Sequence, residues 1–228
     1  MPPSRQGNVN TESVDNYLKA ILALGGPDER RVSSTSLADR LNVAPASVTN
    51  MLQKLAAASV PFVEYERHRG VLLSAAGKRR ALEVVRHHRL LETFLFEVLD
   101  YPIEEVHEEA ERLEHFISER FEERIAAKLG HPKFDPHGHC IPAMDGRMSK
   151  QISKTLTELK HDGEFLVDSV SDRDATLLKR LRTHGITPGA RVQVISRSPD
   201  DFVLRTGNSK ALRLNRNLAT AVRIRSDH

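Results

Sequence analysis

Apolar residues in the first 60 positions recur every three to four residues, which is the spacing of amphipathic helices. The first such stretch ends at Gly25-Gly26-Pro27, because glycine and proline rarely continue a helix. Hydroxyl side chains at Ser34–Ser36 can cap a second, short helix, and Pro45 suits the first turn of a third. The pattern therefore predicts three helices, over residues 14–24, 34–41 and about 45–59.

Two short apolar runs after the third helix predict a β-hairpin, with strands at Phe62–Tyr65 and Val71–Leu73 around a basic, glycine-containing tip. Three helices and a hairpin are the order of a winged helix-turn-helix, in which the third helix enters the major groove and the wing contacts phosphates. A small helical domain that binds no nucleic acid is the alternative. The residues expected to face DNA are Ser47, Thr49, Asn50, Arg67 and Arg69.

The middle of the chain contains two long amphipathic stretches separated by Tyr101-Pro102. They predict one helix that Ser74 caps and that reaches Asp100, and a second from Ile103 to Leu129. The second has a near-heptad apolar seam, which suits packing against other helices, including those of a second copy of the chain, so we expect a homodimer. The seam consists of Ile103, Val106, Ala110, Leu113, Ile117 and Phe121.

The last third of the chain has a different pattern, with short apolar runs that alternate with turns from Glu164 onward. One helix, at about Ala175–Arg182, interrupts the runs, and together they predict a small β-barrel. The expected fold is α+β and multidomain. Its parts are a winged helix-turn-helix (1–74), a helical dimerisation domain (75–146), a polar linker (147–160) and a C-terminal barrel (161–228).

Charge divides the chain in the same way, because the net charge of +3 is the balance of +4 over residues 1–80, −5 over 81–160 and +4 over 161–228. Basic ends suit an anionic partner such as DNA, and the acidic middle also holds seven of the 11 histidines. No apolar run is long enough to span a membrane, and Met1–Gly7 lacks the apolar stretch of a signal peptide. With Cys140 as the single cysteine, these features predict a cytoplasmic protein.

Histidine and glutamate side chains in the acidic middle are spaced for metal binding. His107, Glu111, Glu114 and His115 stand at i, i+4, i+7 and i+8, so one helix would show all four on one face, and His88 and Glu92 form a second i, i+4 pair. Facing helices with nitrogen and oxygen donors can hold a divalent cation. Exposed, merely charged helices are the simplest alternative.

Two other kinds of metal protein are also compatible with these residues. The loop from His131 to Gly146 offers a candidate zinc set, although its spacing fits no standard zinc motif. The Glu/His helices could instead form the di-metal carboxylate centre of an enzyme or storage protein, but that fold needs four long helices. No catalytic nucleophile or phosphate-binding loop is present, so we expect no enzymatic activity. The candidate zinc set is His131, His137, His139 and Cys140.

Ordered motifs along nearly the whole chain resemble the diphtheria toxin repressor (DtxR/MntR) family. They are Asn16–Ile21, Pro45–Thr49, His88–Glu92, His107–His115, Asp135–Gly138 with Ile141-Pro142, and Gly185–Gly189 in a segment similar to the SH3-like (FeoA-like) domain of some members. The resemblance implies a dimeric, metal-dependent transcriptional repressor that binds operator DNA and controls metal-ion homeostasis genes.

The resemblance also implies two metal sites. Glu111, Glu114 and His115 match a regulatory site that takes Asn16 from the first helix. His88, Glu92 and His107 match an ancillary site that can take a ligand from the SH3-like domain, where Asp174 falls at or near the position and Asp172 is its neighbour.

The donors at the regulatory positions bear on which metal is sensed. Iron-responsive members have a cysteine at the position of Glu111 and a methionine at that of Asn16, whereas both donors here are oxygens, which favours Mn²⁺ and leaves Fe²⁺ as the alternative. Manganese members commonly have aspartate at the position of Asn16, and one branch has glutamate at that of Lys19. Asparagine offers only a neutral carbonyl, and a charged lysine cannot coordinate a metal.

Overall fold

The computed structural model describes residues 11–149, 151–207 and 209–226, so the interpretation of Met1–Gly7 concerns a segment outside the described residues. The chain forms two compact units. Of the described residues, the first comprises 11–87, 114–117 and 142–147, and the second comprises 88–113, 118–141, 148–149, 151–207 and 209–226. Within the described ranges, no helix has the length and apolar character that crossing a membrane requires.

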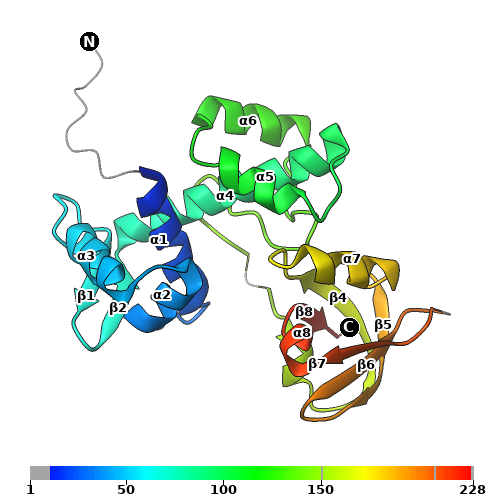
Figure 1. The fold of residues 1–228 in the computed structure, drawn as a ribbon. Helices are drawn as coiled ribbons and strands as arrows, with labels where there is room; N and C mark the ends of the chain where they lie inside the picture. Colours follow the sequence, from blue (N-terminus) through cyan, green and yellow to red (C-terminus); the bar gives the residue numbers. More distant parts are fainter. Residues whose placement is uncertain (1–10, 150, 208, 227–228) are drawn as a thin grey trace. The chain divides into compact units, whose positions relative to one another are not determined.

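The first unit contains the predicted winged helix-turn-helix, and the structure confirms its order of elements (Figure 1). The third helix ends a few residues earlier than predicted, and the hairpin packs beside it. Leu18, Leu37 and Leu52, one from each helix, are fully buried in a common core. The elements are α1 (Thr11–Gly25), α2 (Ser34–Leu41), α3 (Pro45–Ala56), β1 (Val63–Glu66) and β2 (Gly70–Leu73).

Helix α4 (Ala75–Leu99) begins as predicted after Ser74, whose Oγ accepts a hydrogen bond from the Gly77 amide at 3.1 Å. The single helix predicted from Ile103 to Leu129 is wrong. The chain forms α5 (Val106–Leu113) and α6 (Glu119–Lys128) instead, because Ser118 starts a new helix by accepting a hydrogen bond from the Phe121 amide. The break places Glu114 and His115 in the turn after α5.

The residues of the apolar seam predicted for that helix consequently have two different environments, one buried and one exposed. Val106 and Ala110 of α5 are fully buried, and Ile103 just before α5 is nearly so. Leu113 and Phe121 remain largely exposed. Part of the seam therefore belongs to the chain's own core, and part is available to a second copy.

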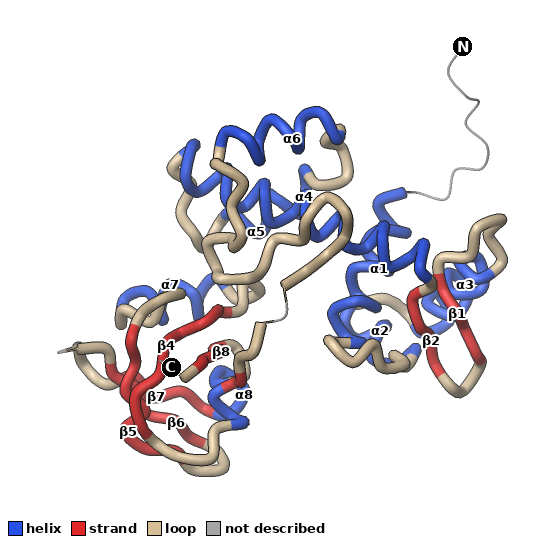
Figure 2. The backbone as a smooth tube through the Cα atoms, turned by 180° about the vertical axis from the view of Figure 1, so that it is seen from behind, coloured by secondary structure: helices blue, strands red, loops and turns tan. Residues whose placement is uncertain are grey.

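The C-terminal part of the second unit is a six-stranded antiparallel sheet with strand order β3-β8-β4-β5-β6-β7 and bulges in β4 and β5. Figure 2 shows its strands curving past one another with α7 and α8 beside them. Buried side chains from the strands and from both helices form one core. The sheet starts inside the segment predicted to be a linker, where Lys154 pairs with Ile224 and Leu156 is fully buried. The elements are β3 (Lys154–Thr155), a 3-10 turn (Leu156–Glu158), β4 (Gly163–Val170), α7 (Ala175–Thr183), β5 (Arg191–Arg197), β6 (Asp201–Arg205), β7 (Leu212–Asn215), α8 (Arg216–Ala219) and β8 (Val222–Arg225).

Candidate metal centre

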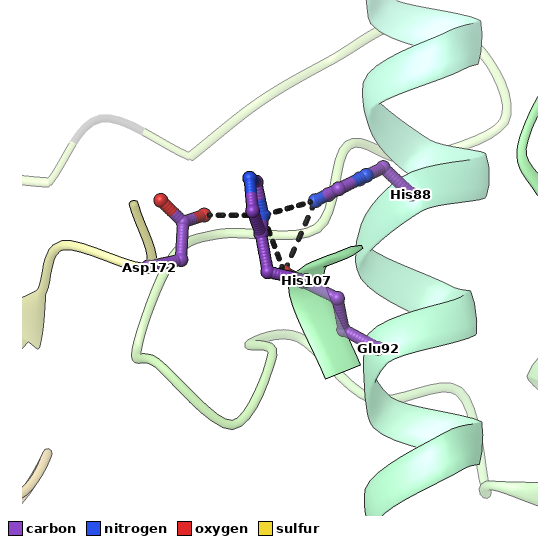
Figure 3. Close-up of side chains that lie close together, drawn as sticks. All are labelled: His88, Glu92, His107 and Asp172. Carbon is purple, nitrogen blue, oxygen red and sulfur yellow. Dashed lines mark hydrogen bonds and ion pairs between the residues drawn. The ribbon is translucent and has the colours of Figure 1, made fainter. Parts of the chain in front are cut away.

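Four side chains of the second unit converge on one point, from α4, from the first turn of α5 and from the segment after β4 (Figure 3). His88 and Glu92 lie one helical turn apart on α4, with His88 Nε2 3.0 Å from Glu92 Oε1. His107 Nδ1 lies 3.1 Å from His88 Nε2 and 3.3 Å from Glu92 Oε1. The ancillary set expected from the sequence is therefore assembled in space.

The C-terminal domain contributes Asp172 to this cluster rather than Asp174. Asp172 Oδ2 lies 3.5 Å from His107 Nδ1. Asp174 is the N-cap of α7 and accepts a hydrogen bond from the Leu177 amide at 2.9 Å. A short carboxylate directly before a helix is a preferred cap, which explains why Asp174 is engaged there.

His137 is a further member that the sequence reasoning did not assign to this centre. Its side chain is fully buried, its Nδ1 lies 3.6 Å from Glu92 Oε1, and its Nε2 lies 3.2 Å from the Ile103 carbonyl oxygen. When His137 is neutral, an Nε2–H that donates to this carbonyl leaves a lone pair on Nδ1, the nitrogen that faces Glu92. The available signal was the Asp135–Gly138 motif, which the resemblance included without giving it a role.

Electrostatics in the cluster depend on Glu92, whose side chain is fully buried. Burial opposes ionisation of this carboxyl, but the surrounding histidines outweigh that effect and hold the pKa of Glu92 well below its usual range. Burial likewise opposes the charged form of His137, yet Glu92 outweighs it and raises the pKa of His137 to about 9. The buried negative charge of Glu92 is thus balanced by histidine nitrogens that can carry a proton.

The donor set fits a divalent cation. One ligand atom each from His88, Glu92, His107 and Asp172 lies within 4.8 Å of the others, a spacing compatible with bonds of about 2.0–2.2 Å to a common ion. Glu92 Oε2 is buried and has no hydrogen-bond partner among the described residues, which leaves a carboxylate oxygen for such an ion. Two or three imidazoles with two carboxylates suit a borderline or hard cation.

The nearby group of Asp135, His137 and His139 has a structural explanation of its own. Asp135 Oδ1 accepts hydrogen bonds from the amides of His137 and His139, each at 2.9 Å, which closes the loop before the Phe134–Cys140 bridge. Cys140 is buried, and its carbonyl accepts a hydrogen bond from Arg89. These contacts favour a loop cap over the zinc site considered from the sequence.

The regulatory set predicted from the resemblance is arranged differently. Glu114 and His115 lie in the first unit with His115 Nε2 3.3 Å from Glu114 Oε1, and the first-helix carboxylate that reaches His115 is Asp15, with Oδ2 3.3 Å from His115 Nδ1. Asn16 is half-buried at the next position. In the second unit, Glu111 on α5 lies 3.9 Å from His88 Nδ1.

Asp15 and Glu114 both have cationic partners within the first unit. Arg80 donates to both oxygens of Asp15 at 2.8 and 2.7 Å, and Lys19 Nζ lies 2.6 Å from Glu114 Oε1. Burial opposes ionisation of Asp15, but hydrogen bonds to His115 and Arg80 outweigh it and hold the pKa of Asp15 below its usual range. The sequence reasoning missed both Asp15 and Arg80.

The residues expected to face DNA lie on α3 and at the hairpin tip. Ser47 and Asn50 are exposed, and Thr49 is half-buried and donates to the Pro45 carbonyl at 3.2 Å. Arg67 and Arg69 are exposed between β1 and β2, and Arg69 forms an ion pair of 3.1 Å with Glu66.

Together, a winged helix-turn-helix and a cluster of nitrogen and oxygen donors define a metal-responsive DNA-binding regulator. Family models match almost the whole described chain. They are "Iron dependent repressor, N-terminal DNA binding domain" over residues 10–71, "Iron dependent repressor, metal binding and dimerisation domain" over 74–143, and "FeoA domain" over 154–226. The chain belongs to the diphtheria toxin repressor (DtxR/MntR) family of metal-dependent transcriptional repressors.

Individual relatives include regulators of iron and of manganese. The iron-dependent repressor IdeR of Mycobacterium tuberculosis is 30% identical over 82% of this chain and 85% of its own length. The regulator MntR of Oceanobacillus iheyensis is 34% identical over 55% of this chain and 82% of its own length. A solved manganese-dependent transcriptional repressor in complex with manganese has a TM-score of 0.83 and 34% identity over 93% of this chain and 99% of that one.

Family membership confirms the predicted fold class and the divalent-metal cofactor. It also makes the protein a transcriptional repressor rather than an enzyme, which excludes the di-metal enzyme considered above. A DNA-binding and a dimerisation domain support operator DNA and a second copy of the chain as partners.

Proposed function

We propose that this repressor responds to manganese and that the ion is held by His88, Glu92, His107 and Asp172, with His137 as a fifth donor. The observation that carries the proposal is the convergence of these side chains around the buried carboxylate of Glu92. No donor in the cluster contains sulfur, and sulfur ligands are those that distinguish softer metals. A bound divalent ion supplies positive charge that neutralises Glu92 and Asp172.

Metal control of DNA binding needs two forms of the protein with different affinities for the ion. His88 and Glu92 are two donors on α4, and Asp172 is a donor from the C-terminal domain. The form of the protein that brings these side chains together therefore binds the ion more tightly than a form that separates them. Moving a population from 1:99 to 99:1 requires about 5.5 kcal/mol of differential binding, which the two centres of a dimer can share.

The proposal is tested by measuring affinity for an operator selected from random DNA duplexes, by fluorescence anisotropy, at controlled free concentrations of Mn²⁺, Fe²⁺ (without oxygen) and Zn²⁺. We expect Mn²⁺ to raise DNA affinity by roughly 5- to 150-fold, the usual range of coupling between two sites. Equal affinity with and without metal would contradict metal control. Half-activation by Fe²⁺ at a lower free concentration than by Mn²⁺ would favour the iron-responsive alternative.

The DNA-binding surface is proposed to comprise Ser47, Thr49 and Asn50 at base edges and the two wing arginines at phosphates. Replacing Arg67 by alanine should weaken binding to all duplexes alike and reduce the slope of log affinity against log salt by about 1, because one phosphate contact is lost. The same titration of Arg120→Ala, which removes an exposed arginine from α6, serves as the control. A change of sequence preference in Arg67→Ala, with an unaltered salt slope, would argue against the phosphate contact.

A further inference from the structure

The buried carboxylates of the first unit are neutralised by the protein's own cations. The Glu114 side chain is fully buried, and Lys19, whose side chain is 16% exposed, contributes an ammonium 2.6 Å from Glu114 Oε1. The Asp15 side chain is 3% exposed and receives the bidentate contact of Arg80. Two carboxylates and two basic side chains therefore form one compact network, with His115 beside both carboxylates.

This network occupies the position where the resemblance implied a regulatory metal. At that position the residues do not fit a divalent ion, because the Lys19 ammonium lies beside the Glu114 carboxylate and an ammonium cannot coordinate a metal. One of the two Glu114 oxygens, Oε1, is already in contact with Lys19 Nζ.

We propose that Lys19 is a built-in cation that takes the place of a metal ion in the first unit. Its ammonium, together with Arg80, holds α1 to the Glu114–His115 turn at every metal concentration. This inference rests on the proposed function, since it leaves the cluster around Glu92 as the site of the metal response. Each chain then binds one regulatory ion rather than two.

A divalent ion at Glu114 would lie close to the Lys19 ammonium, and like charges repel. At a separation of about 4 Å this repulsion weakens Mn²⁺ binding on the order of 30-fold even with the full screening of water, and by more in a buried site. Replacing Lys19 by glutamate removes the cation and adds a carboxylate. Asp15, Glu114 and His115 would then have the donor chemistry of a second manganese site.

The experiment counts Mn²⁺ ions bound per full-length chain, by electron paramagnetic resonance of the free aqueous ion during titration. We expect one ion for wild type, two for Lys19→Glu and one again for Lys19→Glu combined with Glu114→Gln. Lys128→Glu makes the same charge change at an exposed position of α6 and should bind one ion. If Lys19→Glu fails to fold, the Glu114→Gln variant alone tests the proposal, because it should bind the same number of Mn²⁺ ions per chain as wild type.

Two wild-type ions, one of which is lost in Glu114→Gln, would overturn the role proposed for Lys19 and leave the manganese response intact. No gain in Lys19→Glu, with the chain folded, would also overturn it. A wild-type chain that binds no Mn²⁺ while Lys19→Glu binds one would instead support the role of Lys19 and contradict the proposed manganese centre. The counts therefore separate failure of one proposal from failure of the other.

Discussion

Replacing Glu92 by glutamine is expected to abolish the manganese-dependent gain in operator affinity. Glu92 Oε1 lies within 3.6 Å of nitrogen atoms of three histidines, so this carboxylate is the common partner of His88, His107 and His137. Glutamine has nearly the same shape but no charge, and it places an amide where two anionic oxygens stood. The loss should equal the whole coupling between metal and DNA, roughly 5- to 150-fold in affinity.

The measurement is DNA-binding anisotropy with and without Mn²⁺, paired with the count of bound Mn²⁺, which should fall from one to zero in Glu92→Gln. Glu97→Gln is the matched control, because it makes the same change on an exposed residue of the same helix. The basal affinity of Glu92→Gln for DNA without metal should stay close to that of wild type, which shows that the winged helix is intact. A full manganese response in the variant would exclude Glu92 as a ligand.

Much of the fold could be predicted because local signals agree with tertiary packing. Ser74 caps α4 and Pro45 opens α3 as expected, and glycine ends α1 where the apolar periodicity stops. The break between α5 and α6 could not be predicted in the same way, since the apolar spacing continues across it. Ser118 is a strong cap in the structure, but a serine inside a periodic segment is an ambiguous signal.

In the candidate site, too, some residues could be predicted from the sequence and others could not. The i, i+4 pair His88 and Glu92 is fixed by helix geometry, so its convergence could be predicted. Asp15 could not be separated from Asn16, because adjacent helical positions differ by about 100° and the direction of the partner helix is a tertiary property. The choice between Asp172 and Asp174 depends on which carboxylate caps α7, and that requires the helix start to be known within one residue.

The contact between Arg80 and Asp15 carries the largest expected effect on stability. Both oxygens of Asp15 accept hydrogen bonds from Arg80, and the carboxylate is almost fully buried. Removing one partner of a buried pair leaves an uncompensated charge, which costs more than the pair itself contributes. Arg80 is one-third exposed, so water can reach its side of the contact and reduce that cost.

Arg80→Ala should therefore lower the free energy of unfolding by about 3 kcal/mol, the lower end of the range for a broken buried pair. The measurement is urea unfolding of the metal-free chain at pH 7, followed by circular dichroism. Adding Asp15→Asn to Arg80→Ala should restore part of the loss, because the stranded charge is gone. Glu83→Gln removes only the exposed partner of Arg80 and should cost less than about 1 kcal/mol. Equal losses in Glu83→Gln and Arg80→Ala would mean that the buried carboxylate of Asp15 does not depend on Arg80.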